Sequence, residues 1–423
     1  MSFQSSKALT NSLDSPALAP SARFTERALR KALGILECGE LIVEIPGGGR
    51  VVFRGAAPGP QAHLVVHRWR FLARLGSDWD IGFAESYMAG EWSSPDLIAL
   101  LTLACRNQSV VDRLGFFRTP RLWLKLRHAL NRNTRRGSRR NIAAHYDLGN
   151  AFYKHWLDAS MTYSAGLFSN KAKTLEAAQE AKIDQVIELL EPRDGARILE
   201  IGCGWGGLAE RLLKKTCCTL AGITLSTEQL EYGRHRIARH IASGRCDLRL
   251  QDYRDVNGLF DRIVSIEMLE AVGEAYWSTY FKKLRGCLRP GGIAVLQVIT
   301  IAEDRFECYR RRPDFIQKYI FPGGMLPTKQ IIERQASQAG LKVVTRQFFG
   351  DSYARTLEHW HARFQAAWPT IKTMEFDERF RRMWEYYLAY CQAGFDTRAL
   401  DVGFYKLVRP EDSSTSAFSY LMR

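Results

Sequence analysis

Short hydrophobic runs alternate with stretches of helical spacing between about residues 174 and 299. The runs predict buried strands, and they lie at 196–201, 218–224, 247–250, 260–266 and 292–299. A helix is expected at 208–215, and the turn Arg289-Pro290-Gly291-Gly292 is expected to separate the last strand from the helix before it. Strands that alternate with helices favour an α/β fold with a doubly wound, mostly parallel sheet.

The first part of the chain has a different pattern. Residues 1–22 are rich in Ser, Ala and Pro without periodicity, which predicts a disordered tail. A helical stretch is expected at 23–36, and two apolar runs within 41–54 flank Pro46-Gly47-Gly48-Gly49 as in a β-hairpin. A mixed segment then ends in an apolar helix near Asn107. We therefore predict a small α+β domain over residues 23–112.

A basic segment over residues 113–140 follows this domain. No acidic residue lies between Asp112 and Asp147, whereas ten Lys and Arg residues do. Leu122, Leu126 and Leu130 are four positions apart and make a narrow apolar stripe among the charges. Two interpretations remain open: a helix that lies on an anionic membrane surface, or a solvated connector that docks on a neighbouring domain. Residues 141–423 form the second, larger domain.

The composition is that of a globular chain. It has 423 residues, 46% of them hydrophobic and 25% charged, and Lys plus Arg outnumber Asp plus Glu by 60 to 45. The net charge of +15 predicts a polyanionic neighbour, either membrane headgroups or nucleic acid. Nine cysteines without a Cys-x-x-Cys pair indicate reduced thiols in a cytoplasmic protein and no metal site. The longest strongly apolar run, 292–302, is about half of the ~20 residues of a spanning helix, so membrane contact is expected to be peripheral.

The most informative motif lies at 197–208. A buried strand carries Glu200 near its end and runs into Gly202, Gly204 and Gly206, so the backbone can approach a ligand and open a helix beside it. This Gly-x-Gly-x-Gly loop, with the acidic residue and the later Arg-Pro-Gly-Gly turn, resembles the class I methyltransferases that bind S-adenosylmethionine.

The following strand departs from the usual nucleotide-binding pattern. It ends at Thr224 rather than at the Asp or Glu that commonly holds ribose hydroxyls. Thr224, Ser226 and Gln229 are therefore expected to share that role. Alternatively, Ser226 or Thr227 serves only as a helix cap.

Five motifs in one order identify a narrower resemblance. They are His145-Tyr146-Asp147-Leu148-Gly149-Asn150, Met161-Thr162-Tyr163-Ser164, Gly202-Cys203-Gly204-Trp205-Gly206-Gly207, Gln251-Asp252-Tyr253-Arg254-Asp255 and Lys318-Tyr319-Ile320-Phe321-Pro322-Gly323-Gly324. Together they resemble the cyclopropane-fatty-acyl-phospholipid synthase family, which includes mycolic-acid cyclopropane synthases and methyltransferases that make 10-methyl or methylene-branched acids. The resemblance covers about residues 140–410 and, less specifically, 82–92. It implies a class I methyltransferase fold, Rossmann-like with a mostly parallel seven-stranded sheet, for residues 141–423.

The resemblance also implies a cofactor site for S-adenosylmethionine. The residues expected to form it are Tyr163, Ser164, Glu200, Gly202, Gly204, Gly206, Thr224, Leu225, Gln229, Asp252 and Tyr253. For Tyr163 and Tyr253, packing in the core is the alternative interpretation. His145 and Asp147 are either a hydrogen-bonded structural pair or chemical groups, and both interpretations stay open.

The family further implies a bicarbonate ion beside the substrate, held by a Cys, a Glu, a His, an Ile backbone and a Tyr. Glu270, Ile299 and Tyr353 match three of these positions, whereas Ala165 stands in place of the Cys and Gln297 in place of the His. An Ala supplies only its backbone N–H, and a Gln carries no charge. These two departures leave bicarbonate binding open.

The implied reaction transfers a methyl group to a cis double bond of an unsaturated acyl chain of membrane phospholipid and leaves a carbocation. We hypothesise that Glu270, directly or through bicarbonate or water, is the base, and that Gln297 and Tyr353 orient it. Glu267 is the competing carboxylate, with a contact to adenosine as its alternative role. Tyr353, Tyr319, Tyr146 and Glu270 are expected to stabilise the cation. Loss of a methyl proton closes a cyclopropane ring, whereas a prior hydride shift gives a methylene branch.

Other functions remain as alternatives. They are a branched-chain acyl methyltransferase, a small-amine methyltransferase, a nucleic-acid modifier and an inactive lipid-binding relative. Ser265-Ile266-Glu267-Met268 lacks the Asn/Asp-Pro-Pro-aromatic loop of amino-methylating nucleic-acid enzymes, so we expect no nucleic-acid partner. We expect a cytoplasmic protein on the inner face of the membrane, held by the basic segment and by Arg310-Arg311-Arg312. A homodimer is left open.

Overall fold

The computed structural model describes residues 36–77, 79–110, 134, 137–138 and 148–411. The chain divides into two compact units, residues 1–118 and 119–423. The tail predicted at 1–22, most of the helix predicted at 23–36 and most of the basic segment at 113–140 lie outside the described residues. The same holds for His145, Tyr146 and Asp147.

The first unit contains a four-stranded sheet with strand order β2-β1-β3-β4. Its elements are β1 (Cys38–Ile45), β2 (Gly49–Arg54), β3 (Ala57–Val66), α2 (Arg70–Ser77), α3 (Trp79–Met88), β4 (Trp92–Ser93) and α4 (Leu97–Arg106). β1 pairs antiparallel with β2 and parallel with β3, and Ile45 lies opposite Gly49 at the turn. The predicted hairpin, the apolar helix near Asn107 and the α+β character are confirmed.

Two buried polar side chains fasten this unit. The amide group of Asn107, at the end of α4, accepts hydrogen bonds from the backbone N–H of Glu37 (2.8 Å) and Cys38 (3.1 Å) and donates to the Leu103 carbonyl (2.8 Å). The indole N–H of Trp92 donates to the Phe83 carbonyl (3.0 Å), and its ring stacks on the Phe83 ring at 4.3 Å. Segment 82–92 therefore has a packing role.

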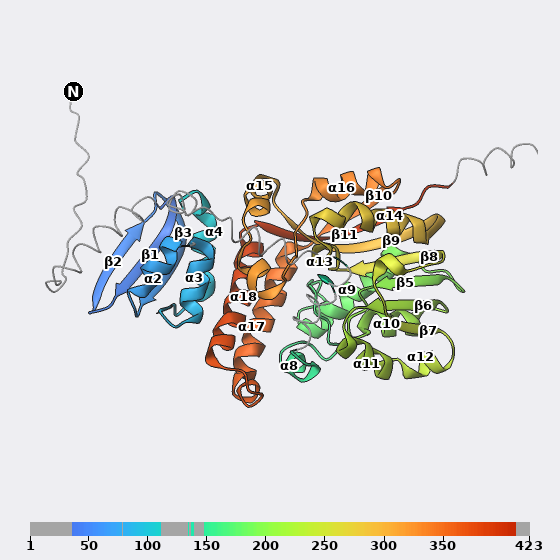
Figure 1. Ribbon diagram of the computed structural model, residues 1–423, viewed down its shortest axis with the longest axis horizontal. Helices are drawn as coiled ribbons and strands as arrows, with labels where there is room; N and C mark the ends of the chain where they lie inside the picture. The colour runs from blue at the N-terminus through green and yellow to red at the C-terminus, as the bar shows by residue number, and fades with distance from the viewer. Residues whose placement is uncertain (1–35, 78, 111–133, 135–136, 139–147, 412–423) are drawn as a thin grey trace, which may run out of the picture. The chain divides into compact units, whose positions relative to one another are not determined.

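The second unit is built on a seven-stranded sheet with strand order β10-β11-β9-β8-β5-β6-β7 (Figure 1). The strands are β5 (Arg197–Ile201), β6 (Thr219–Thr224), β7 (Cys246–Leu250), β8 (Phe260–Ile266), β9 (Leu288–Ile301), β10 (Lys342–Phe348) and β11 (Leu400–Val408). β7, β6, β5, β8 and β9 run parallel, and β11 runs antiparallel to both of its neighbours. The predicted mostly parallel sheet is confirmed.

Helices cover both faces of this sheet (Figure 1). The helices of the unit are α8 (Asn150–Lys154), α9 (Leu175–Leu190), α10 (Gly207–Lys215), α11 (Thr227–Arg236), α12 (Ala238–Ala242), α13 (Leu269–Val272), α14 (Trp277–Cys287), α15 (Glu303–Arg311), α16 (Lys329–Gln338), α17 (Gly350–Lys372) and α18 (Glu378–Asp396). Two short 3₁₀ turns, η1 (Tyr253–Asp255) and η2 (Glu274–Tyr276), and one π-helical turn, η3 (Ile316–Ile320), complete it. α17 and α18 pack against each other as a long pair.

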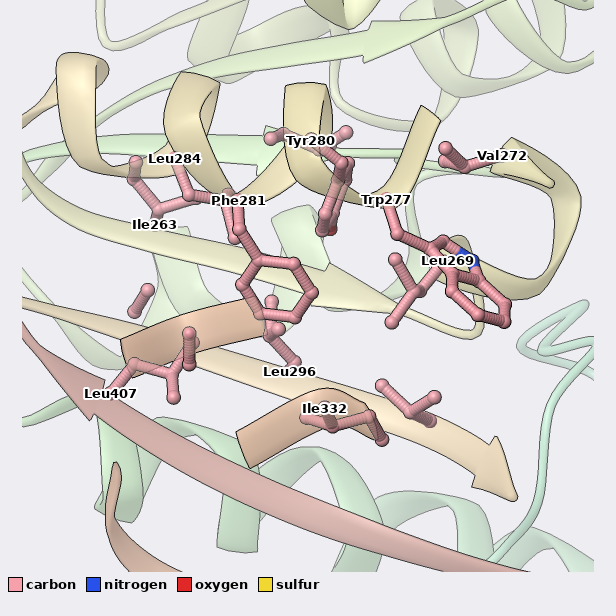
Figure 2. Close-up of a cluster of buried hydrophobic side chains, with 14 of the residues drawn as sticks. Ile263, Leu269, Val272, Trp277, Tyr280, Phe281, Leu284, Leu296, Ile332 and Leu407 are labelled. Atoms are coloured by element: carbon pink, nitrogen blue, oxygen red, sulfur yellow. The ribbon is translucent and has the colours of Figure 1, made fainter. Parts of the chain in front are cut away.

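The central strands β5, β8 and β9 contain consecutive buried residues because both of their faces lie under helices. In β8, Ile263 belongs to the core cluster formed with α14, and the next residue, Val264, belongs to the cluster formed with α9 and α10. Figure 2 shows the first cluster, where Tyr280 and Phe281 of α14 extend toward the sheet. Such continuous apolar runs are typical of parallel sheets buried on both sides.

The observed boundaries test the sequence predictions closely. Four of the five predicted strands and the helix after the glycine loop agree within one residue. The turn predicted at 289–292 is wrong, because these residues are part of β9. Phe260 pairs with Leu288 and Arg262 with Ile293, so the segment bulges out of the ladder, with Gly291 at φ 71°.

No helix of the described residues is long and apolar enough to span a bilayer. All nine cysteines lie within the described residues, and none is in a disulfide.

Candidate active site

The glycine loop joins the carboxyl end of β5 to the first turn of α10. Gly202, Gly204 and Gly206 all have positive φ, at 82°, 51° and 80°, a conformation that glycine adopts without strain. A Cβ atom built on Gly204 would meet no atom within 4 Å, so the loop presents open backbone on that side. Backbone N–H groups at a helix N-terminus then face the space where a polar ligand can lie.

Side chains outside the glycine loop form hydrogen bonds with Trp205, which lies within it. The indole N–H of Trp205 donates to Asn150 Oδ1 at 2.6 Å, and the Asn150 amide donates to Glu228 Oε2 at 3.1 Å. The Arg236 guanidinium donates to the Ser160 carbonyl (2.7 Å) and the Trp205 carbonyl (3.1 Å). The Asn150 side chain therefore helps to hold the glycine loop in place through Trp205.

The polar residues at and after the end of β6 had two possible roles, contact with the ribose and capping of the next helix, and the structure assigns the capping role to Ser226. Ser226 is the N-cap of α11, because its hydroxyl accepts the Gln229 N–H at 3.3 Å. Thr224 Oγ1 donates to Gln229 Oε1 at 2.9 Å, and both side chains are buried. Leu225 is half-buried between them. Thr224 and Gln229 thus stay as candidates for the ribose, whereas the Ser226 hydroxyl is used as the cap.

Asp252 and Tyr253 follow β7. The Asp252 carboxylate accepts two hydrogen bonds from the Arg254 guanidinium, at 2.8 and 2.6 Å. Tyr253 packs edge-on against Tyr280 at 5.3 Å within the core, and burial raises the pKa of its hydroxyl to about 12. The core-packing interpretation therefore applies to the Tyr253 ring.

The segment 163–168 is fastened by three helices. Tyr163 shares a hydrogen bond between hydroxyl groups with Tyr387 of α18 at 2.7 Å, and its ring lies 5.2 Å from Trp360 of α17. The backbone N–H groups of Gly166 and Phe168 donate to Thr356 and Ser352 of α17, at 3.0 and 3.1 Å. On α9, Lys182 donates to Ser164 Oγ at 2.7 Å.

Glu267, just after β8, is the carboxylate on which the site converges. Its Oε1 accepts the Ala165 N–H at 3.0 Å and the Gln297 side-chain N–H at 2.6 Å, and its Oε2 accepts the Tyr353 hydroxyl at 2.7 Å. Burial raises the pKa of Glu267, while these three hydrogen bonds and the charge of Lys182 oppose the rise. Burial and the Glu267 charge also hold the pKa of Tyr353 well above its ordinary value, so Tyr353 keeps its proton and donates.

The backbone at Glu267 is itself unusual. Its φ is 48°, in the left-handed region that costs about 1–2 kcal/mol for a residue other than glycine. Its N–H donates to the Gln297 carbonyl at 2.8 Å, which holds the strained residue against β9. Strain of this kind concentrates where a side chain must point in a required direction.

Glu270, at the start of α13, makes a different set of contacts. Its Oε1 accepts the Ile299 N–H at 2.5 Å, and its Oε2 is buried without a hydrogen bond to any described residue. Burial and the charge of Glu267 raise the pKa of Glu270 to about 8. The Glu270 carbonyl accepts the N–H of Met325, directly after the Pro-Gly-Gly motif, at 2.8 Å. At neutral pH the Glu270 carboxyl group is therefore protonated, whereas the three donors and the Lys182 charge favour the ionised form of Glu267.

The structure corrects one part of the sequence hypothesis. Gln297 and Tyr353 donate to Glu267, not to Glu270. Glu270 accepts the N–H of Ile299, a residue that was expected to hold bicarbonate. The residues expected to hold bicarbonate do not fit that ion, since Ala165, Gln297 and Tyr353 already donate to a carboxylate of the chain itself. A second anion there would also be repelled by Glu267.

Similarity to known proteins identifies the family of this chain. A sequence profile described as mycolic acid cyclopropane synthetase matches residues 133–404. The chain belongs to this family. It is an S-adenosylmethionine-dependent methyltransferase, and the predicted family, fold and cofactor are confirmed.

Relatives of this methyltransferase include proteins with different names for their products. The tuberculostearic acid methyltransferase UfaA1 of Mycobacterium tuberculosis is 41% identical over 371 residues, 84% of this chain and 85% of that protein. The cyclopropane-fatty-acyl-phospholipid synthase of Escherichia coli is 34% identical over 363 residues, 85% of this chain and 89% of that protein. The solved structure of the cyclopropane synthase MmaA2 from Mycobacterium tuberculosis matches with a TM-score of 0.60 at 30% identity, over 64% of this chain and 97% of that one.

The methyltransferase fold also exposes what sequence reasoning missed. Lys182, Gln179, Trp360 and Tyr387 surround the segment 163–168 without belonging to any motif used above. For Lys182 a signal existed, because a lysine at helical spacing from Ala178 and Val186 lies on the apolar face of α9. Tyr319, which was expected to stabilise the carbocation, lies in η3 and packs on Phe315, the residue before η3.

Proposed function

We propose that this methyltransferase moves the methyl group of S-adenosylmethionine to a cis double bond of an unsaturated acyl chain in membrane phospholipid, with Glu267 as the base. The observation that carries the proposal is the Glu267 carboxylate, held by three groups that can only donate in this geometry. The names of the relatives UfaA1 and cyclopropane-fatty-acyl-phospholipid synthase support a fatty acyl substrate.

The chemistry explains why such a carboxylate is needed. Bound S-adenosylmethionine supplies a methyl group that is attached to a sulfonium, and an alkene is a weak nucleophile, so positioning must supply much of the rate. A C–C bond forms as the C–S bond breaks, and positive charge is left on the neighbouring carbon. A fixed anion beside that carbon stabilises the charge and then accepts the proton. Glu267 can serve both purposes because Ala165, Gln297 and Tyr353 hold it in one orientation.

We place a methylene-branched chain first among the products. In that sequence a hydride moves to the cationic carbon, and the methyl group then loses a proton to give a C=CH₂ branch. Ala165, Gln297 and the Glu267 contact distinguish this site from the Cys, His and bicarbonate arrangement that the resemblance implied for cyclopropane formation. The 41% identity to a protein named tuberculostearic acid methyltransferase supports the same choice.

A cyclopropane ring is the second candidate. There the proton leaves the new methyl group directly, and the electrons of its C–H bond close the ring. The 34% identity to the cyclopropane-fatty-acyl-phospholipid synthase over 85% of the chain favours it.

The decisive test uses labelled S-adenosylmethionine, purified protein and vesicles of an anionic phospholipid with cis-unsaturated chains. The released fatty acids are examined by proton NMR, because mass does not separate a ring from a methylene branch. We expect olefinic methylene signals. Upfield ring-methylene signals would select the second candidate, and no label in any lipid would reject the proposed function.

Association with an anionic membrane forms part of the proposal. It draws on the ten cations in 113–140, all of which lie outside the described residues. Arg310-Arg311-Arg312 supports it less than expected, since Arg310 pairs with Glu274 at 2.8 Å and Arg311 with Glu307 at 3.2 Å. Each free Lys or Arg near the surface contributes roughly 1 kcal/mol.

Raising the salt concentration is therefore expected to release the protein from anionic vesicles. Screening shortens the range of the attraction to about 3 Å at 1 M salt. Co-sedimentation with anionic and with neutral vesicles, at low and high salt, measures the effect. Binding that is equal for both vesicle types, or indifferent to salt, would contradict an electrostatic attachment.

A further inference from the structure

Lys182 is a buried ammonium group that the reaction above leaves without a role. It lies on the inner face of α9 and is 2% exposed. Its Nζ donates to Ser164 Oγ at 2.7 Å, and it forms no ion pair with any residue that the structure describes. A buried lysine that is satisfied only by a hydroxyl is costly for folding, which calls for a compensating function.

The charges that face Lys182 come from three segments. They are Glu267 after β8, Asp158 in the loop after α8, and Glu200 in β5. The Asp158 carboxylate accepts the backbone N–H groups of Ser160 and Thr162 in its own turn. Glu200 Oε2 is buried without a hydrogen bond within the described part of the chain, and burial raises the pKa of Glu200 to about 8, so its carboxyl group is protonated at neutral pH. Of the three charges, that of Glu267 opposes the lowering of the Lys182 pKa most strongly, and Glu267 is the one in the reaction site.

The contact to Ser164 ties the cation to the same carboxylate through the backbone. Ser164 precedes Ala165, whose N–H donates to Glu267 Oε1 at 3.0 Å. One turn before Lys182, the Gln179 amide donates to the Ser164 carbonyl at 2.7 Å and the Thr162 carbonyl at 3.4 Å. Helix α9 therefore holds the segment 163–168 through two contacts, one from the neutral amide of Gln179 and one from the charged amine of Lys182.

We propose that Lys182 is a positioning residue whose buried positive charge keeps Glu267 ionised for the reaction, while its hydrogen bond to Ser164 holds the Ala165 N–H on that carboxylate. The proposal rests on the proposed role of Glu267 as the base. Around Glu267 the other titratable groups are Glu270, whose pKa is raised, and Tyr353, which stays protonated. The positive charge of Lys182 opposes the rise in the Glu267 pKa that burial causes.

The sign of the pH effect follows from these charges. Removal of a nearby positive charge disfavours the carboxylate, so the acidic limb of the rate profile should move to higher pH. Burial lowers the pKa of Lys182 to about 8, so the wild-type protein loses this assistance above that pH. The difference between wild type and a neutral variant should therefore be largest at acidic pH and should shrink at alkaline pH to the constant loss caused by the missing hydrogen bond to Ser164.

The experiment compares Lys182→Met, Lys182→Arg and Gln179→Met with wild type. We expect Lys182→Met to lose roughly tenfold in kcat/KM at the acidic end beyond any constant loss, since a shift of one pH unit is a factor of ten. This additional loss should vanish as the pH rises. Lys182→Arg should keep the wild-type profile. Gln179→Met, the matched control, removes the neutral contact to the same segment and should lower the rate equally at every pH.

A second measurement does not depend on turnover. In protein that carries ¹³C at the glutamate side-chain carboxyl, the Glu267 resonance is assigned by its loss in Glu267→Gln and then titrated. Its midpoint should rise in Lys182→Met and stay unchanged in Gln179→Met. A midpoint unchanged in Lys182→Met, or a rate loss that is the same at all pH values, would overturn the proposal. If wild type labels no lipid, the proposed function fails, while this titration still decides the role of Lys182.

Discussion

Glu267→Gln is expected to lower the rate of methyl transfer by about 10²–10⁴-fold, the usual contribution of a general base. The amide has nearly the same shape but carries no charge and accepts no proton. The new amide N–H group would also face a hydrogen-bond donor, because Ala165, Gln297 and Tyr353 all donate to the carboxylate of Glu267. Binding of S-adenosylmethionine, measured by calorimetry, should stay within about threefold of wild type.

Glu270→Gln is the matched control for this prediction. Because the pKa of Glu270 is about 8, its carboxyl group is protonated near neutral pH, and an amide imitates that state. We expect less than about a tenfold loss at pH 7. An equal loss in both variants, or full turnover by Glu267→Gln, would reject the assignment of the base.

The same assay tests the misfit between the site and bicarbonate. Wild type should turn over at the same rate in carbonate-free buffer and after addition of bicarbonate, because Ala165, Gln297 and Tyr353 already hold the Glu267 carboxylate. If the turnover rate of wild type depended strongly on bicarbonate, the base would be the added ion and not Glu267.

Trp360→Ala is expected to destabilise the second unit by about 3–5 kcal/mol, the usual cost of removing a large buried aromatic side chain. Trp360 is fully buried at 0% exposure, and its ring lies 5.7 Å from Trp156, 5.2 Å from Tyr163 and 6.1 Å from Tyr353. The ring thus packs between a residue expected at the cofactor and one that orients Glu267. Weaker binding of S-adenosylmethionine should accompany the loss of stability.

Urea unfolding followed by far-UV circular dichroism measures this effect. Trp69→Ala removes the same side chain from an exposed position, at 38% exposure, and should change the stability of its unit by less than about 0.5 kcal/mol. Similar shifts for the two variants would show that the Trp360 cluster does not contribute as its burial suggests.

Much of the fold followed from local sequence patterns. The strands from β5 to β8 could be located because each is a short apolar run bounded by turn residues, and the glycine loop because only closely spaced glycines permit its positive φ angles. β10 and β11 were not predicted. Every residue of β10 is exposed or half-buried, and its sequence is not a continuous apolar run, so it carries a weak strand signal.

The site divides in the same way. The motifs by themselves determined the family, the cofactor and the two carboxylates, because the chemistry requires those residue types at fixed local spacings. Only the tertiary structure decided which carboxylate the donors reach. Ala165 and Glu267 are 102 positions apart, Gln297 and Glu267 30, and Tyr353 and Glu267 86, so their meeting depends on how the segment 163–168, β9 and α17 pack. The charge state of Glu267 likewise depends on Lys182, since burial and the approach of charges arise only when distant elements fold together.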